Sequence, residues 1–181
     1  MTLPNDNDIQ GVIFKKLTSY PDGRGFFREI FRHDEDVFTN GKFAQWSHSK
    51  MQKNVVKAWH FHHKQTDWWY IPVGQAEVVL YDNREESPTY QKKLVFNLGE
   101  ADNYENTFEA CVRIPPGVLH ACQVMSDYAH LFYITSEKYD PQDEGRIAYN
   151  SDKIPHKWTS EAITSEKDRV DFMPPHERVI A

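Results

Sequence analysis

Three of the nine histidines in the chain, His60, His62 and His63, are nearly adjacent, and a fourth, His120, follows the turn-forming segment Pro115-Pro116-Gly117. Histidine exchanges a proton near neutral pH and is also the commonest metal ligand in proteins. If the first group lies on a strand, the two-residue period aims His60 and His62 to the same side. The spacing therefore fits both proton-transfer chemistry and metal binding.

A metal site could be built from His60, His62, Asp67 and His120. Their order, with Gly74 after Asp67, resembles the two motifs of metal-binding cupins, in which two histidines, a glutamate and a later histidine hold a divalent ion. Imidazole and carboxylate ligands together suit iron, manganese, nickel or zinc. Asp67 stands where that motif has glutamate, so its shorter side chain would have to reach further.

The elements that must position these side chains are expected to be short strands. Segments rich in β-branched and aromatic residues follow one another and are separated by turn residues. Many short strands with few helices are typical of an antiparallel sandwich or barrel. Helical turns are expected only near 34–39 and 160–168. The expected strands are 12–17, 26–31, 43–50, 55–61, 68–73, 76–81, 94–96, 110–114, 121–125 and 129–135.

The length of 181 residues indicates a single domain, 1–181, with a core over about 12–137 and a polar tail, 138–181, held by Trp158 and Phe172. An excess of Asp and Glu (27) over Lys and Arg (21) does not favour nucleic-acid binding. The two cysteines form no C-x-x-C pair and are expected to be reduced thiols. Because no signal-peptide pattern or membrane-length apolar stretch is found, we expect a cytoplasmic protein without a membrane partner.

Several separated motifs stand in an order that resembles one enzyme family. The motifs cover 22–29 (D-G-R-G-F-F-R-E), 45–49 (Q-W-S-H-S), 56–61 (V-K-A-W-H-F), 82–90 (D-N-R-E-E-S-P-T-Y), 114–120 (I-P-P-G-V-L-H), the pair Tyr133 and Tyr139, and 163–168 (I-T-S-E-K-D). On this joint order the chain is identified as a divergent member of the dTDP-4-dehydrorhamnose 3,5-epimerase family, which belongs to the cupin superfamily. The resemblance runs from about residue 12 to residue 168.

The resemblance implies an all-β, cupin-type jelly-roll barrel with a few short helices, and an epimerase of deoxysugar biosynthesis that uses no cofactor. The family removes a proton next to the ketone of a nucleotide 4-keto-6-deoxyhexose, at C3, C5 or both, and returns one to the other face. Such a C–H bond breaks readily only if the base is well placed and the enolate is stabilised. By resemblance His60 is the base, Asp168 orients its ring, and Tyr133 is the acid.

The resemblance also implies how the substrate, a nucleoside-diphosphate 4-keto sugar, is bound. Arg24 and Lys57 are candidates for the diphosphate, since arginine grips phosphate oxygens with two parallel bonds and lysine acts as a point charge. In the family the arm that carries Arg24, Phe27 and Glu29 reaches into a neighbouring subunit, which implies a homodimer with N-terminal arm exchange. The other residues expected at the substrate are Gln45, His120 and Tyr139.

The sequence departs from the family pattern at positions close to the expected chemistry. Lys57 stands where the family has arginine, and Ser47 stands where it has asparagine. Asp67 falls where the family usually carries a lysine that holds the enolate oxygen, and Val78 falls where it has an aspartate. An ionised Asp67 would repel an enolate, so Lys64 or another donor would have to serve.

Two alternatives to the epimerase therefore stay open. One is a metal-dependent cupin enzyme that uses His60, His62, Asp67 and His120. The other is a non-catalytic nucleotide-sugar binding relative that kept the pocket and lost the enolate stabiliser. Outside the pocket, Arg84 is expected to form a structural ion pair and to take no part in the chemistry.

Overall fold

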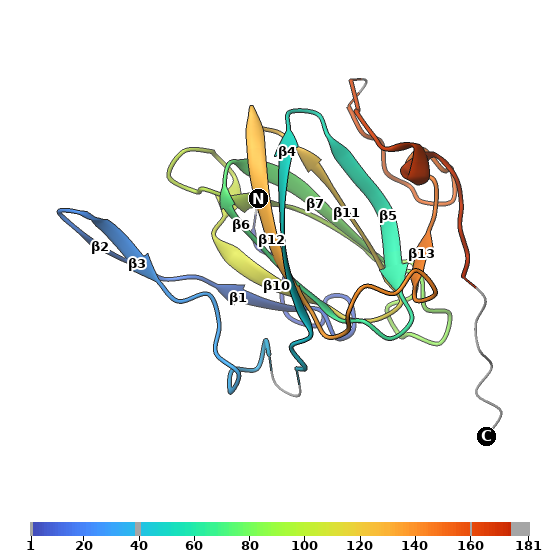
Figure 1. Ribbon diagram of the computed structural model, residues 1–181, viewed down its shortest axis with the longest axis horizontal. Coiled ribbons are helices and arrows are strands. Elements are labelled where there is room, and N and C mark those ends of the chain that lie inside the picture. Colours follow the sequence, from blue (N-terminus) through green and yellow to red (C-terminus); the bar gives the residue numbers. More distant parts are fainter. Residues whose placement is uncertain (1, 39–40, 160, 175–181) are drawn as a thin grey trace.

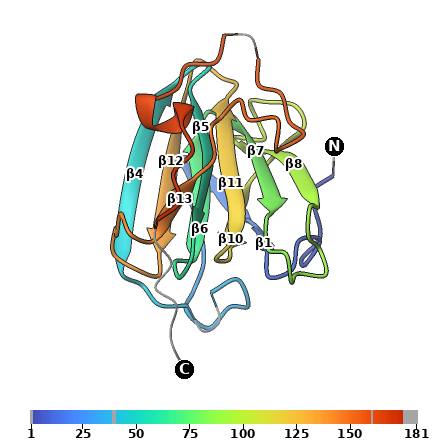
Figure 2. The same ribbon diagram turned by 90° about the vertical axis from the view of Figure 1, so that its right-hand side faces the viewer.

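Two β-sheets face each other in the computed structural model, which describes residues 2–38, 41–159 and 161–174 (Figures 1 and 2). The first sheet has the order β1 (Ile13–Lys16), β10 (Ala110–Ile114), β6 (Asp67–Val73), β12 (Tyr128–Thr135), β4 (Gln45–Gln52). The second has the order β13 (Glu144–Arg146), β5 (Val56–His62), β11 (Val118–Val124), β7 (Gln75–Asp82), β8 (Lys93–Gly99), β9 (Thr107–Phe108). All pairings in the two sheets are antiparallel except that of β8 with β9.

This architecture confirms the all-β jelly-roll class, although the two sheets do not close into one barrel within the described residues. Alternate strand residues point between the sheets and form the main core. Val78 and Leu80 of β7 and Ile71 of β6 belong to this core and are almost completely buried. Burying a side chain of this size stabilises the fold by about 1.5–3 kcal/mol.

The expected strands were confirmed for most of the sandwich, and three short ones were missed. The missed strands are β2 (Ser19–Asp22), β9 and β13, each of two to four residues. The expected strand at 26–31 is β3 (Gly25–Arg28), which ends earlier and pairs with β2 as a hairpin. This hairpin projects away from the sandwich (Figure 1).

The expected helix at 34–39 was wrong over its described part, because 34–38 form turns. The turns bring the Phe38 ring to 4.6 Å from that of Trp68, and the carbonyl of Val37 accepts a hydrogen bond from Trp68 Nε1 at 2.6 Å. The described residues contain one short 3-10 helix, η1 (Glu166–Arg169), and no helix long and apolar enough to cross a membrane. Both cysteines are buried and unpaired.

The C-terminal segment lies along β5. Strand β13 pairs with β5, and the Arg146 guanidinium lies 4.9 Å from the centre of the Phe172 ring. The Trp158 ring lies 5.1 Å from that of Trp59. These contacts place η1, and with it Asp168, beside the middle of β5 (Figure 2).

Candidate active site

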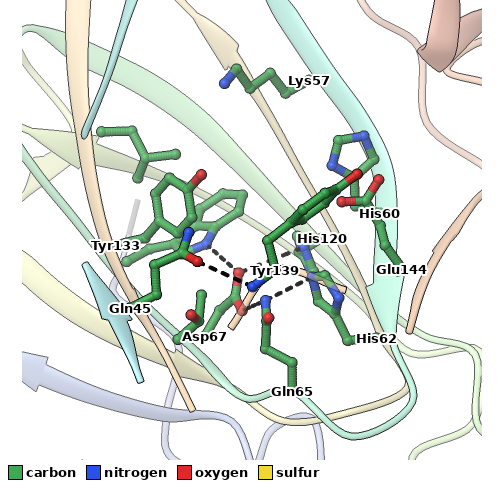
Figure 3. Close-up of a pocket in the computed structure, with 13 residues that line it drawn as sticks. Gln45, Lys57, His60, His62, Gln65, Asp67, His120, Tyr133, Tyr139 and Glu144 are labelled. Atoms are coloured by element: carbon green, nitrogen blue, oxygen red, sulfur yellow. Dashed lines mark hydrogen bonds and ion pairs between the residues drawn. The ribbon is translucent and has the colours of Figure 1, made fainter. Parts of the chain in front are cut away.

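A cavity of about 190 Å³ opens between the two sheets (Figure 3). Strands of both sheets contribute to its walls, which combine imidazole, carboxylate, amide and phenol groups. The lining residues are Gln45, Lys57, His60, His62, Gln65, Asp67, Trp69, His120, Leu131, Tyr133, Thr135, Tyr139 and Glu144.

Strand β5 supplies Lys57, His60 and His62 to the cavity. His60 and His62 share a face because side chains alternate along a strand, as expected. Lys57 lies an odd number of residues from His60, and it reaches the same cavity because the register between β5 and β11 shifts between these two positions. A β-bulge of this kind redirects a side chain next to a functional site.

His60 is held by a carboxylate from the C-terminal segment. Its Nε2 lies 2.8 Å from Oδ1 of Asp168, whose side chain is almost fully buried. The backbone of Asp168 is itself fixed by Ser165, whose hydroxyl accepts a hydrogen bond from its N–H at 3.3 Å. With Nε2–H donating to Asp168, Nδ1 is the nitrogen of His60 that can accept a proton.

Tyr133 enters the same cavity from the opposite sheet. It lies on β12, next to β6, whereas His60 lies on β5. Figure 3 shows the two side chains on different walls of the cavity. A ligand between them would therefore face a base on one side and a phenol on the other.

The floor of the cavity contains a hydrogen-bonded group around Asp67. The Gln65 amide nitrogen lies 2.7 Å from Asp67 Oδ1 and 3.1 Å from His62 Nε2. Trp69 Nε1 donates to Asp67 Oδ2 at 3.1 Å. Burial raises the pKa of the Asp67 carboxyl, and nearby His62 opposes this shift. Burial also lowers the pKa of His120 well below its usual value, with His62 and His60 adding to the effect.

Among the described residues, the group with metal-ligand geometry is His62, Asp67 and His120, whose ligand atoms lie within 4.8 Å of one another. His60 does not belong to this group. The four-residue arrangement expected from the cupin motif is therefore not formed, and three of its members lie close enough together to hold an ion.

Lys57 lies at the end of the cavity away from Asp67, and Gln45 and Tyr139 also line the cavity (Figure 3). Lys57 Nζ donates to the Ser49 hydroxyl at 2.8 Å. The amide oxygen of Gln45 accepts a hydrogen bond from the Tyr139 backbone N–H at 3.1 Å, which fixes the segment that carries the Tyr139 ring. Lys57 thus places a positive charge at the end of the cavity away from Asp67.

Three expected substrate residues do not line this cavity. Arg24, Phe27 and Glu29 lie on or just after the β2–β3 hairpin, which points away from the sandwich. The Arg24 side chain is 90% exposed and paired with Asp22 at 2.6 Å. Lys64 is also exposed and is not part of the lining, so it does not supply the missing enolate donor.

Five lining residues were not anticipated. Trp69 follows Asp67 by two positions, and Leu131 and Thr135 flank Tyr133 by two, so strand alternation could have indicated them. Gln65 and Glu144 carried no comparable signal. Glu144 reaches the cavity because β13, too short to show a periodic pattern, pairs with β5 opposite His62.

A family model described as dTDP-4-dehydrorhamnose 3,5-epimerase matches residues 6–173. The chain belongs to the dTDP-4-dehydrorhamnose 3,5-epimerase family. It is 40% identical over 156 residues to the spore coat polysaccharide biosynthesis protein SpsL of Bacillus subtilis strain 168, covering 84% of this chain and 98% of that protein. It is 31% identical over 156 residues to the dTDP-4-dehydrorhamnose 3,5-epimerase of Salmonella typhimurium, covering 83% of this chain and 82% of that protein.

A solved structure of the family superimposes on nearly the whole chain. It is the dTDP-6-deoxy-D-glucose-3,5-epimerase RmlC of Legionella pneumophila in complex with dTDP-4-keto-L-rhamnose. The TM-score is 0.78 at 26% identity, and the match covers 90% of this chain and 87% of that one. Family membership makes the chain an isomerase of the carbohydrate-epimerase class, as the motif order predicts.

Proposed function

We propose that the protein epimerises a nucleoside-diphosphate 4-keto-6-deoxyhexose at a carbon next to the ketone. The observation that carries this proposal is the placement of His60, bonded to Asp168 at 2.8 Å, and of Tyr133 on different walls of one cavity. The ligand of the Legionella structure, dTDP-4-keto-L-rhamnose, belongs to this substrate class.

In the proposed reaction, Nδ1 of His60 takes the proton from C3 or C5, and the C–H electron pair moves to the 4-keto oxygen to form an enolate. Asp168 keeps Nε2 protonated and stabilises the imidazolium. The Tyr133 hydroxyl then gives its proton to the same carbon from the opposite face. His60 loses its proton to solvent and Tyr133 regains one, so the substrate composition is unchanged and solvent hydrogen enters the product.

For the diphosphate, we propose Lys57 of the same chain and Arg24 of a second chain. Lys57 lies at the end of the cavity away from Asp67, where phosphate oxygens would meet an ammonium group. Arg24 is exposed on a projecting hairpin whose Phe26 and Phe27 are 61% and 64% exposed. Aromatic side chains this exposed are typical of an interface, which supports a homodimer in which the two hairpins are exchanged.

The alternative of a metal-dependent cupin with His60 as a ligand is disfavoured because His60 lies outside the group of His62, Asp67 and His120, whose ligand atoms lie within 4.8 Å of one another. The alternative of a binding protein without activity is disfavoured by the complete set of His60, Asp168 and Tyr133. Both alternatives make different predictions from the epimerase for isotope exchange.

The test is deuterium incorporation from D₂O into C3 and C5 of dTDP-4-keto-6-deoxyglucose, followed by NMR and mass spectrometry. We expect exchange by the unaltered protein and a loss of at least about 100-fold in His60→Ala, since general base catalysis contributes about 10²–10⁴-fold. His63→Ala is the matched control, because His63 lies three residues along the same segment and outside the cavity lining. No exchange with any nucleotide 4-keto sugar would contradict the proposal.

A further inference from the structure

Asp67 places a carboxylate at the floor of a cavity that, on the proposed function, must also hold an anionic enolate. Only 4% of the residue is exposed. Its hydrogen-bond donors, the Gln65 amide and the Trp69 indole, are neutral. The positively charged Lys57 lies at the other end of the cavity (Figure 3). An ionised Asp67 would repel the enolate, and a cation between the two would offset both negative charges.

Two lone-pair acceptors on the floor converge on one point. The amide nitrogen of Gln65 lies at that point, 2.7 Å from Asp67 Oδ1 and 3.1 Å from His62 Nε2. The third acceptor, His120 Nε2, lies 3.9 Å from Asp67 Oδ2. The ligand atoms of His62, Asp67 and His120 thus lie close together, and a terminal amide lies between those of His62 and Asp67 in this structure.

The outer nitrogen of His120 has the kind of partner that metal-bound histidines usually have. His120 Nδ1 lies 3.2 Å from the carbonyl oxygen of Val118, to which it donates. This hydrogen bond fixes the tautomer so that Nε2 keeps its lone pair for the metal. The Nδ1 atom of His62 lies 3.9 Å from the Asp143 carboxylate, which is too far for a hydrogen bond in this structure.

We propose that His62, Asp67 and His120 bind one divalent transition-metal ion, which faces the 4-keto oxygen of the substrate. Two imidazoles and one carboxylate are ligands that zinc and iron(II) accept, and three protein ligands leave a position open. The ligand atoms lie within 4.8 Å of one another. Tetrahedral coordination at 2.0–2.2 Å requires roughly 3.4 Å, so the side chains close by about 1 Å once the Gln65 amide swings aside.

This inference rests on the proposed function and supplies its missing part, the group that stabilises the enolate. A divalent ion polarises a carbonyl oxygen as a Lewis acid and offsets the charge of the enolate. It also compensates the buried Asp67 carboxylate. His60 stays outside the ligand set and keeps Nδ1 for the substrate, so metal binding and proton abstraction are compatible in one cavity.

The binding test uses the full chain, purified without a metal-binding tag. The metal content of the protein is measured by mass spectrometry, and ZnCl₂ and CoCl₂ are titrated into chelator-treated protein by calorimetry and by visible absorption. We expect about one ion per chain, and binding at least about 10-fold weaker in Asp67→Asn and His62→Gln. His63→Gln, a histidine of the same segment outside the cluster, is the matched control and should bind like the unaltered protein.

Thermal unfolding of each variant shows whether the fold is kept. If Asp67→Asn does not fold, His62→Gln decides the outcome. Equal affinity in the folded variants and the unaltered protein overturns the proposed site, as does the absence of any bound ion.

The catalytic part is tested by deuterium exchange before and after chelation. We expect chelation to lower exchange at least about 10-fold and Zn²⁺ to restore it. Undiminished exchange by metal-free protein overturns the metal inference and leaves the epimerase standing. If the protein binds one ion per chain but exchanges no hydrogen of any nucleotide 4-keto sugar, the epimerase proposal is overturned, and the enolate role of the ion with it. The metal site itself still stands in that case, because ion binding is measured independently of exchange.

Discussion

At the residue scale, the proposed chemistry depends on which nitrogen of His60 carries the proton. Asp168 accepts from Nε2 and so leaves Nδ1 free to serve as the proposed base. The two residues are far apart in the sequence, and the contact exists because the C-terminal segment runs along β5 and presents η1 to it. A single carboxylate outside the sheets thereby sets the tautomer of the base.

Replacement of Asp168 by asparagine should reverse that tautomer preference. The asparagine amide can donate to Nε2, which leaves the proton on Nδ1 and blocks the base, so we expect exchange to fall by about 100- to 10,000-fold. The measurement is the deuterium-exchange rate, with the melting temperature as a check on folding. Asp171→Asn, at a more exposed carboxylate three residues on, is the control. A loss of less than about threefold in Asp168→Asn would rule out the orienting role.

Tyr133→Phe should separate the two proton transfers. His60 can still remove and return a proton on its own face, so deuterium should enter the substrate with its configuration retained. Delivery to the opposite face needs the hydroxyl, so the epimerised product should fall by about 100-fold or more. NMR distinguishes labelled starting material from labelled epimer. A variant that forms the epimer at the normal rate would show that another group is the acid.

The residues of the site were only partly predictable from the sequence. His60, His120, Tyr133 and Asp168 lie inside motifs, and each motif keeps its spacing because it belongs to one strand or turn. Glu144 joins them through the pairing of β13 with β5, a long-range contact without a local pattern. The choice between four and three candidate metal ligands also needed the structure, since it depends on where His60 lies relative to His62, Asp67 and His120.

At the element scale, the motif at 82–90 begins with the last residue of β7 and continues into the loop that follows. None of its residues lines the cavity. Asp82 is completely buried and accepts hydrogen bonds from Arg84 at 2.7 Å and from Ser87 and Thr89, each at 2.6 Å. Burial alone would raise the pKa of the Asp82 carboxyl, but these hydrogen bonds outweigh it and lower the pKa to about 2. The expected structural ion pair of Arg84 is therefore confirmed.

The folded-state pKa of Asp82 lies below its unfolded value, so the ionised carboxylate stabilises the fold near neutral pH. This contribution is lost as the pH falls from about 4 toward 2. We expect Asp82→Asn to lower the free energy of unfolding by about 2 kcal/mol at pH 7 and by progressively less below pH 4. Urea unfolding at several pH values measures this, with the exposed Glu86→Gln as control. A pH-independent difference would contradict the assignment.

The correct prediction of the strands and the wrong prediction of a helix at 34–39 are both explained by how these segments pack against the rest of the chain. Strands such as β8 bury alternate residues along most of their length, so a two-residue period appears in the sequence. The segment at 34–38 has Val37 and Phe38 as its apolar residues, and its turns bury both against Trp68. Tertiary packing thus overrides a weak local preference.

At the scale of the whole molecule, the body and the hairpin have different roles. The sandwich holds the cavity, whereas the β2–β3 hairpin extends beyond it with Arg24 near its tip (Figure 1). The single domain expected over 1–181 stays a prediction, as does the tail at 138–181, although the C-terminal segment does contact β5. If Arg24 binds the diphosphate as proposed, the chain needs a second copy to complete the site, because Arg24 lies outside its own cavity.

Arm exchange makes a prediction that a simple dimer does not. Arg24→Ala and His60→Ala chains should each be nearly inactive alone. After mixing, unfolding and refolding together, half of the dimers are mixed, and one of the two sites in each mixed dimer regains both intact residues. We therefore expect about a quarter of the exchange rate of the unaltered protein.

The control is a mixture of His60→Ala with Tyr133→Phe chains. Both residues line one cavity of one chain, so each site in a mixed dimer still lacks one of them and epimer formation should not recover. Sedimentation velocity verifies that the mixed species are dimers. No recovery in the Arg24 mixture would place Arg24 and His60 in the same subunit's site or remove Arg24 from the reaction, because complementation requires residues contributed by different chains. Recovery in the control would show that His60 and Tyr133 act from different chains and would contradict the proposed site.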